Sequence, residues 1–396
     1  MSTRTIIRIG DLGRVVTGRT PPSTEMEHFR GNIPFLTPSD IDGFNRTVRT
    51  ERSVSSDWDR QQGRISLPPR SICVVCIGAT IGKVCFTSTQ SQSNQQINSI
   101  IADETRFDAL FIYYLLRLMG DELRQRAAGA ATPILNKSAF CGIEIGVPTR
   151  PAQQRIASIL GAYDDLIEVN RRRIAILEEM ARWIYEELCI RNSDEWPTKR
   201  LDDLIDVDPT TRVPRDGPKP FIPMTSVQNS SMLITAIERR DGNSGSKFIN
   251  GDTLLARITP CLENGKTGYV DFLTPEEPVG FGSTEFIVMR GRSVPPEFVQ
   301  LLARSESFRA HAIASMSGAT GRQRVRRESI EQYPIAVPPA HHLETLVRSG
   351  RPIFALARTL AEQIVNLTAQ RDLLLPKLIS GEIDVSEAPA IAEAAE

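Results

Sequence analysis

The chain has 396 residues, of which 40% are hydrophobic and 24% charged, a balance typical of globular proteins and sufficient for two or three hydrophobic cores. Because no stretch approaches the roughly 18 uninterrupted apolar residues that a membrane-spanning helix needs, the sequence excludes a membrane protein. A net charge of −1 gives no overall support for nucleic-acid binding. The N-terminal segment lacks the apolar region of a secretory signal and the six cysteines are unevenly spaced, so we expect a cytoplasmic protein with reduced thiols.

Residues 1–150 show short strand-like runs separated by turns, followed by a helical pattern. The segment 72–86 (ICVVCIGATIGKVCF) predicts a β-hairpin, and the segment 107–119 predicts a helix. We therefore assign an α+β domain to residues 1–150. Its basic and polar residues that could contact a nucleic acid are Arg46, Arg49, Lys83, Gln95, Gln96, Asn136 and Lys137.

Residues 151–195 predict one long helix, because apolar residues recur at alternating spacings of three and four, as in the heptad seam of a coiled coil. A polar residue on this seam, Asn170, could fix the register of a coiled coil or could be tolerated near a helix bend. The helix would be about 50 Å long, which exceeds one turn of DNA and suits a spacer. The seam residues are Ile156, Leu160, Ile167, Asn170, Ile174, Leu177 and Ile184.

The segment 196–340 repeats the organisation of the first 150 residues. Val147-Pro148 returns as Val337-Pro338, and Gly82-Lys83 returns as Gly265-Lys266. A second hairpin is predicted over 252–272 and a helix over 296–314, so we assign a second α+β domain. Its candidate DNA contacts, mostly in an arginine-rich stretch, are Lys266, Thr320, Arg322, Gln323, Arg324, Arg326 and Arg327. Arginine outnumbers lysine 40 to 7, which favours recognition of phosphate or guanine, although a GC-rich genome produces the same bias.

Residues 341–383 predict a second long helix on the same heptad spacing, with Leu360, Ile364 and Leu367 on its seam. Pro376 lies in its last turn and should kink or end it, so we expect the two helices to differ in length. The acidic segment 384–396 has no aromatic residue and is expected to be disordered.

Several chemical functions are not supported by the sequence. Two fragments around Gly82-Lys83 and Gly265-Lys266 imitate a phosphate-binding loop, but neither has the required glycine spacing, and tight turns explain both. Cys73, Cys76 and Cys85 lack a fourth zinc ligand nearby, which favours buried strand thiols. The motifs of flipped-base methyltransferases and of Rossmann domains are absent. We therefore predict no catalytic residue and no metal ligand.

The motifs in their order resemble a known family. The turns of the two predicted hairpins contain the motifs IGATIGK (77–83) and PCLENGKTG (260–268). The two predicted helices begin with VPTRPAQQRIASIL and VPPAHHLETLV, and the second ends with LLLPKLISGEI (373–383). This doubled arrangement resembles the specificity subunits of type I restriction-modification systems. One departure is His341-His342, where the first helix has Gln153-Gln154.

The resemblance implies a fold and a function. Two target-recognition domains would alternate with two helices that pair as an antiparallel coiled coil, and each domain would read one half of a bipartite, asymmetric double-stranded DNA target. The subunit would be non-catalytic and would bind two methyltransferase subunits and two restriction subunits. AdoMet, ATP and Mg²⁺ would belong to those partners, with no cofactor bound by this chain.

Two alternatives come from other classes of protein. A self-sufficient DNA methyltransferase or endonuclease with a degenerate site would take up AdoMet or ATP as the isolated chain. A coiled-coil scaffold with no role in DNA binding would form complexes that are insensitive to salt and to DNA.

Overall fold

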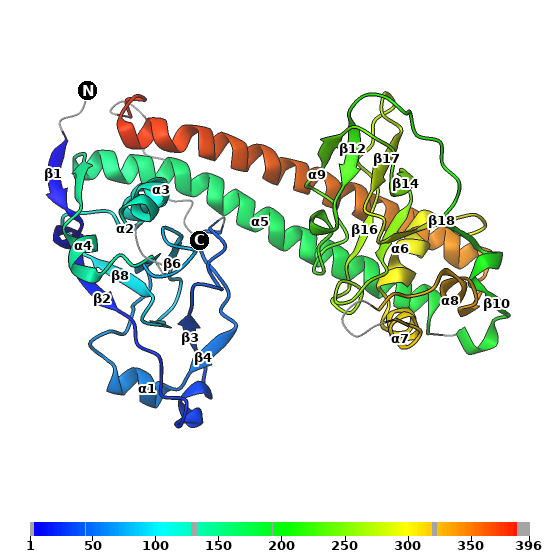
Figure 1. Cartoon of the computed structure of the whole chain (residues 1–396), viewed down its shortest axis with the longest axis horizontal. Helices are drawn as coiled ribbons and strands as arrows, with labels where there is room; N and C mark the ends of the chain where they lie inside the picture. Colours follow the sequence, from blue (N-terminus) through cyan, green and yellow to red (C-terminus); the bar gives the residue numbers. More distant parts are fainter. Residues whose placement is uncertain (1–3, 44, 128–132, 192, 319–322, 386–396) are drawn as a thin grey trace. The chain divides into compact units, whose positions relative to one another are not determined.

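The computed structural model describes residues 4–43, 45–127, 133–191, 193–318 and 323–385. The chain divides into two compact units. Unit 1 comprises Met1–Ile167 with Leu367–Glu396, and unit 2 comprises Glu168–Asn366. Two long helices, α5 (Arg150–Cys189) and α9 (Ala340–Ser380), contribute residues to both units (Figure 1). Within the described ranges, no helix combines the length and apolar character needed to cross a membrane.

Unit 1 is built on a four-stranded antiparallel sheet with the order β2-β8-β5-β6. A smaller sheet has the order β4-β3-β7, in which β3 and β7 run parallel, and β1 pairs with β9. The strands are β1 (Thr5–Arg8), β2 (Gly13–Thr17), β3 (Ile33–Leu36), β4 (Arg52–Val54), β5 (Ile72–Val75), β6 (Val84–Phe86), β7 (Gln92–Ser93), β8 (Ile97–Ala102) and β9 (Glu144–Val147).

Helices α2, α3 and α4 share the core of the larger sheet, whereas Trp58 of α1 packs against Phe35 and Val54 of the smaller sheet. Asp108 caps α2 by accepting a hydrogen bond from the Phe111 amide at 2.9 Å, and α2 is buried along most of its length. The same core includes Leu160 of α5 and Leu378 of α9, so the chain returns to unit 1 after passing through unit 2. The helices are α1 (Ser56–Gln61), α2 (Ala109–Leu118), α3 (Gly120–Arg126) and α4 (Lys137–Cys141).

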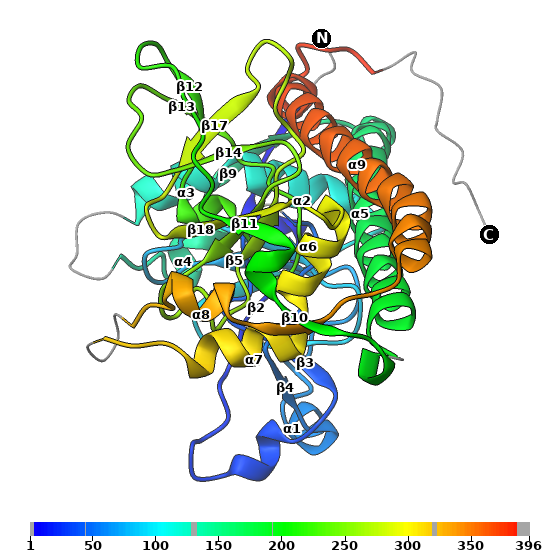
Figure 2. The ribbon, with the colours of Figure 1, turned by 90° about the vertical axis from the view of Figure 1, so that its right-hand side faces the viewer.

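Unit 2 has the same strand arrangement with one additional strand, β14, in its smaller sheet. Its larger sheet has the order β11-β18-β15-β16, its smaller sheet has the order β13-β12-β17-β14 with β12 and β17 parallel, and β10 pairs with β19. Figure 2 shows β12, β13 and β17 side by side in the smaller sheet. The strands are β10 (Thr198–Arg200), β11 (Ile205–Val207), β12 (Lys219–Ile222), β13 (Glu238–Arg240), β14 (Ser246–Ile249), β15 (Thr253–Ala256), β16 (Thr267–Tyr269), β17 (Val279–Gly282), β18 (Phe286–Gly291) and β19 (Pro334–Ala336).

The predicted α+β class and both hairpins are confirmed. In unit 1, β5 and β6 pair with Ile72 opposite Phe86, and in unit 2, β15 and β16 pair with Thr253 opposite Tyr269. β14 lies between β13 and β15 in the chain and has no counterpart among the described strands of unit 1. The internal repeat is therefore a repeat of topology as well as of sequence motifs.

The single helix predicted over 296–314 is wrong in detail, because two helices occupy this segment. These are α6 (Pro296–Arg304) and α7 (Glu306–Ala314). Ser305 separates them, since its extended backbone ends α6 and its hydroxyl accepts a hydrogen bond from the Phe308 amide at 3.4 Å. A third short helix, α8 (Arg327–Glu331), follows in unit 2.

The expected difference in length between the two long helices is also wrong. α5 has 40 residues and α9 has 41, and α9 continues through Pro376 for one further turn. A proline removes one backbone hydrogen bond, but Leu375, Leu378 and Ile379 hold this turn in the core of unit 1. Burial of these side chains therefore outweighs the local preference of proline.

Within unit 1, α5 and α9 run antiparallel, because the Arg155 side chain donates to the Val385 carbonyl at 3.3 Å whereas Asp164 lies against Arg371. Within unit 2, the Asn170 amide donates to Gln363 at 3.1 Å. Of the predicted seam residues, the buried ones are Ile156, Leu160, Ile167, Asn170 and Leu360, and the half-buried ones are Ile174, Leu177, Ile184, Ile364 and Leu367. Val385 is buried in the core of unit 1, and residues 386–396 of the predicted disordered tail lie outside the described residues.

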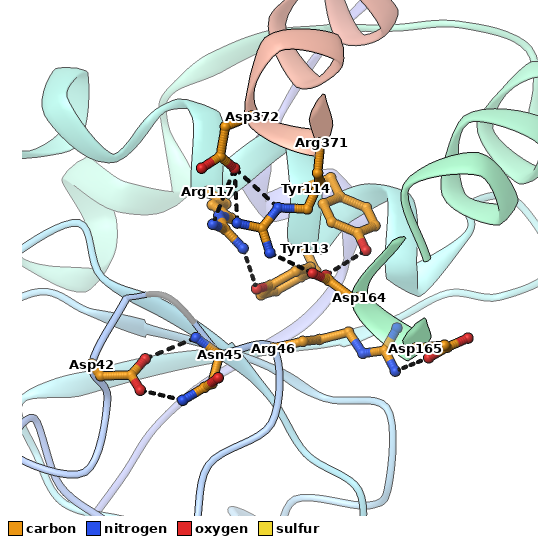
Figure 3. A network of polar contacts seen from close by, with 10 residues as sticks. All are labelled: Asp42, Asn45, Arg46, Tyr113, Tyr114, Arg117, Asp164, Asp165, Arg371 and Asp372. Carbon is orange, nitrogen blue, oxygen red and sulfur yellow. Dashed lines mark hydrogen bonds and ion pairs between the residues drawn. The ribbon is translucent and has the colours of Figure 1, made fainter. Parts of the chain in front are cut away.

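A buried ionic network joins α2, α5 and α9 in unit 1 (Figure 3). The Arg371 side chain is 2% exposed and donates to one carboxylate oxygen of Asp164, whose side chain is 5% exposed. The Tyr114 hydroxyl donates to the other oxygen of Asp164 at 2.6 Å, and Arg371 also donates to Asp372 at 2.9 Å. Burial disfavours the charged form of Arg371, but the two carboxylates outweigh this effect and raise its pKa.

Candidate nucleic-acid interface

Three polar segments of unit 1 meet beside the end of β5. The Cys76 amide donates to the Gln96 carbonyl at 2.8 Å, and the Leu135 amide donates to the Cys76 carbonyl at 2.8 Å. The Gly78 amide donates to the Pro133 carbonyl at 3.0 Å. These bonds tie together residues 76–78, 94–96 and 133–137, which we call the loop cluster of unit 1.

Unit 2 contains the same arrangement beside the end of β15. The Arg257 amide donates to the Glu285 carbonyl and the Val325 amide donates to the Arg257 carbonyl, both at 2.9 Å. The Thr259 amide donates to the Gln323 carbonyl at 3.1 Å. Residues 257–259, 283–285 and 323–327 therefore form the loop cluster of unit 2. Each hydrogen bond has its equivalent in unit 1, so the two clusters share one backbone framework.

The loop cluster of unit 1 contains four of the predicted DNA contacts. Gln95 is exposed and accepts a hydrogen bond from Thr20 at 2.6 Å, and Gln96 accepts one from Asn94 at 2.9 Å. Asn136 caps α4, and Lys137 is the exposed first residue of that helix. The structure thus brings together amide side chains and one cation from two separate segments, which is the kind of surface that reads base edges and phosphates.

The loop cluster of unit 2 contains Gln323, Arg324, Arg326 and Arg327. The last three are exposed, and Arg327 is bound to Glu331 one turn further along α8 at 2.6 Å. Arg326 precedes α8 and has no ion pair within the described residues. The two other predicted contacts of this stretch, Thr320 and Arg322, lie outside the described residues.

Arg324 forms an ion pair with Glu285, a residue that was not among the predicted contacts. Its Nε donates to Glu285 Oε2 at 2.9 Å, and a second guanidinium nitrogen bonds the same carboxylate. The hydrogen bond to Arg324 lowers the pKa of Glu285, against a smaller opposing effect of burial. Glu285 therefore stays ionised and orients the guanidinium, and its position is equivalent to that of Gln96.

The two loop clusters differ in charge at equivalent positions. Where unit 2 has Arg257, unit 1 has Cys76, and burial raises the pKa of that thiol to about 11, so it is neutral at physiological pH. Where unit 2 has the Arg324–Glu285 pair, unit 1 has Ile134 and Gln96. Neither Arg257 nor Glu285 was among the predicted contacts, although Glu285 follows β17 as Gln96 follows β7 and could be found by aligning these two segments of the repeat.

Lys83 and Lys266 occupy equivalent places outside the loop clusters. Each directly precedes the return strand of its hairpin, and the Lys83 carbonyl accepts from Val75 at 2.9 Å as the Lys266 carbonyl accepts from Ala256 at 3.1 Å. The Lys266 ammonium donates to the Met224 carbonyl at 3.1 Å. The predicted equivalence of the two Gly-Lys pairs therefore holds, and Lys266 already has a partner within the protein.

Arg46 and Arg49 also lie outside the loop cluster of unit 1. Arg46 forms an ion pair with Asp165 of α5 at 2.5 Å (Figure 3), and this hydrogen bond outweighs the effect of burial and raises the pKa of Arg46. Arg49 is exposed and has no ion pair within the described part of unit 1. Of these two candidates, Arg49 is the one with a guanidinium left available to a ligand.

The cysteines are all free thiols, and four of the six are buried. Cys73 and Cys85 lie opposite each other on β5 and β6, where their side chains pack in the sheet. Among the described residues, no group of three or more His, Cys, Asp or Glu side chains is arranged to hold a metal ion.

Comparison with known proteins identifies relatives over nearly the whole chain. Residues 1–179 match the model of the type I restriction modification DNA specificity domain. The specificity subunit of the type I restriction enzyme MjaIX from Methanocaldococcus jannaschii is 26% identical over 416 residues, covering 96% of this chain and 93% of that protein. The HindI specificity subunit from Haemophilus influenzae is 35% identical over 158 residues, covering 38% of this chain and 34% of that protein.

A solved structure shares the fold. The crystal structure of the S subunit of a type I restriction-modification system from M. genitalium superimposes with a TM-score of 0.60 at 15% identity, and the match covers 95% of this chain and 96% of that chain. The two-unit architecture with its long helices is therefore an established fold.

Proposed function

Because the chain belongs to the specificity subunits of type I restriction-modification systems, we propose that its two loop clusters read the two halves of a bipartite, asymmetric DNA target. The observation that carries this proposal is the shared backbone framework with different side chains. The cluster of unit 1 presents amides, whereas that of unit 2 presents arginines and the Glu285 carboxylate. Amides pair with adenine, arginine pairs with guanine, and a carboxylate accepts from cytosine, so the two units suit different base sequences.

The chain is the non-catalytic recognition component of its enzyme, as its named relatives are. AdoMet, ATP and Mg²⁺ are expected on the partner subunits, which supply the chemistry in the cytoplasm of the host. The alternatives of a self-sufficient methyltransferase or a scaffold without DNA are not favoured by these relatives.

We propose that α5 binds the methyltransferase subunits through an exposed apolar stripe. Its members recur at spacings of three, four and seven, so they lie on one face of the helix, apart from the buried seam. A face of this kind is matched by an apolar surface of a partner protein. Two methyltransferase and two restriction subunits would complete the enzyme, with α5 and α9 setting the spacing of the two readers. The stripe residues in unit 2 are Val169, Ile176, Met180 and Trp183.

The function is tested by expressing the chain together with the methyltransferase subunits of its host and mapping methyladenine across the genome. We expect one methylated motif made of two unlike half-sites separated by unspecified bases. Omitting this chain should abolish the methylation. A contiguous or palindromic motif, or no motif at all, would contradict the assignment of one half-site to each unit.

Replacing Arg326 with alanine should weaken DNA binding of the assembled complex, because this exposed guanidinium has no partner in the described protein. If it contacts a phosphate, the slope of log K against log salt concentration falls by about one. Arg327→Ala is the matched comparison, since Arg327 is already paired with Glu331 and its loss should change the slope less. Equal effects of both variants would show that the ion pair does not limit the availability of Arg327.

A further inference from the structure

A polar cavity of about 500 Å³ lies in unit 2 next to its loop cluster. Four segments line it: the residues after β11, the start of β14, the residue after β15, and the turn between β17 and β18. They contribute Thr210, Lys247, Arg257 and Thr284 to the wall, and Asp208 is also present. Arg257 and Thr284 belong to the loop cluster, so the cavity adjoins the surface assigned to DNA.

The cavity contains hydrogen-bond donors that the protein leaves unused. The Nε atom of Arg257 is buried and has no hydrogen-bond partner within the described residues, and its Nη2 reaches the Val325 carbonyl only at 3.5 Å. The Lys247 ammonium and the hydroxyls of Thr210 and Thr284 also make no hydrogen bond in the described part of unit 2. Of these donors, only Arg257 Nε is buried, and a buried donor without an acceptor is costly, so a ligand that supplies acceptor oxygens would be favoured here. Lys247 is half-buried and the hydroxyls of Thr210 and Thr284 are exposed, so they can reach the same ligand.

The charges around the cavity select an anionic ligand. Lys247 and Arg257 provide two positive charges against the single carboxylate of Asp208. That carboxylate accepts a hydrogen bond from the Val288 amide at 2.9 Å, and the nearby Glu285 is occupied by Arg324. Both acidic groups are therefore engaged by the protein, whereas both cations retain free donors.

The fold itself does not require a cation at this position. In unit 1, the equivalent residue Cys76 makes the same pair of backbone hydrogen bonds and is buried as a neutral thiol. The shared backbone framework therefore forms without a positive charge at this position. This comparison indicates that the charge of Arg257 serves to bind a ligand rather than to stabilise the fold.

We propose that this cavity binds a phosphate group of the DNA backbone, with Arg257 and Lys247 as the charged ligands and Thr210 and Thr284 as hydroxyl donors. The inference rests on the proposed function, because the phosphate belongs to the target that unit 2 reads. All four groups donate hydrogen bonds, which matches the acceptor oxygens of a phosphodiester. The contact positions unit 2 on the duplex and carries no base sequence of its own.

The test measures DNA affinity of the complex assembled with its methyltransferase subunits, at several salt concentrations, on a duplex that carries the mapped methylation motif. Arg257→Gln and Lys247→Gln should each lower the slope of log K against log salt concentration by about one. The methylated motif should stay the same in Lys247→Gln, because Lys247 lies in β14 outside the loop cluster. Lys199→Gln removes an exposed charge of unit 2 outside the cavity wall and should leave the slope unchanged. Thermal unfolding of each variant checks that unit 2 remains folded.

The outcomes separate this inference from the proposed function. If the wild-type complex binds its motif and both cavity variants keep the wild-type slope, the phosphate site is wrong and the proposed function stands. If a variant relaxes one position of the methylated motif without changing the slope, the cavity reads a base, which also overturns the proposal. A wild-type complex that recognises no motif contradicts the proposed function itself.

Discussion

Replacing Arg371 with methionine is expected to destabilise unit 1 by about 3–5 kcal/mol. Methionine retains much of the apolar bulk but removes the guanidinium, so among the described residues the buried Asp164 carboxylate is left with the hydrogen bond from Tyr114. An uncompensated buried charge carries a large desolvation cost, which is why breaking the pair costs far more than losing an exposed ion pair. Denaturant unfolding of the full chain measures the change.

The fluorescence of Trp58 isolates the response of unit 1. It is buried in that unit, and the other two tryptophans, Trp183 and Trp196, can be replaced by phenylalanine in every protein compared. Arg124→Met, which removes an exposed ion pair in the same unit, should cost less than about 1 kcal/mol. The double variant Arg371→Met, Asp164→Leu should regain part of the stability, since it removes both charges of this buried pair. Equal losses for Arg371→Met and Arg124→Met would contradict the role of the network.

Replacing Trp183 with alanine is expected to weaken binding of the methyltransferase subunits by about 2–4 kcal/mol, or roughly 30- to 1,000-fold. Trp183 is 62% exposed and lies on the apolar stripe with Ile176 and Met180. Tryptophan at the centre of an interface contributes more than most residues because it buries a large area. Because these side chains face solvent, the substitution should leave the folding of unit 2 intact.

Isothermal titration of the purified methyltransferase subunits into the chain measures this effect. Arg182→Ala changes an exposed residue of the same helix that has no three- or four-residue spacing to the stripe, and it should alter the affinity by less than about 1 kcal/mol. Ile176→Asp tests a second point of the stripe and should also lower affinity strongly, since a charge would be buried on binding. Wild-type affinity in both stripe variants would mean that the subunits bind elsewhere.

Features set by local spacing could be predicted from the sequence. The alternation of apolar residues at three and four positions located α5 and α9, and the strand-like runs around Gly82 and Gly265 located the hairpins β5–β6 and β15–β16. The repeated motifs also predicted that one topology occurs twice. The helices and hairpins are signalled by neighbouring residues, and the repeat by short motifs that recur in the same order.

Features set by contacts between distant residues could not be predicted in the same way. Arg46 looked available to DNA, yet its partner Asp165 is 119 residues away. Arg257 is part of the site because its backbone is hydrogen-bonded to Glu285 and Val325, which are distant in the sequence. No local motif predicts these hydrogen bonds. Proline disfavours the interior of a helix, so Pro376 locally predicts a kink or an end, but burial of Leu375 and Leu378 keeps α9 helical.

The core of unit 1 has a consequence for the order of events during synthesis. It joins Ile9 with Leu378 and Val385, which are translated more than 360 residues after it. All of unit 2 is translated in between. Unit 2 can therefore reach its native state before unit 1. Until α9 has been translated, the strands of unit 1 keep part of their apolar surface exposed, and a chaperone could bind this surface throughout the synthesis of unit 2.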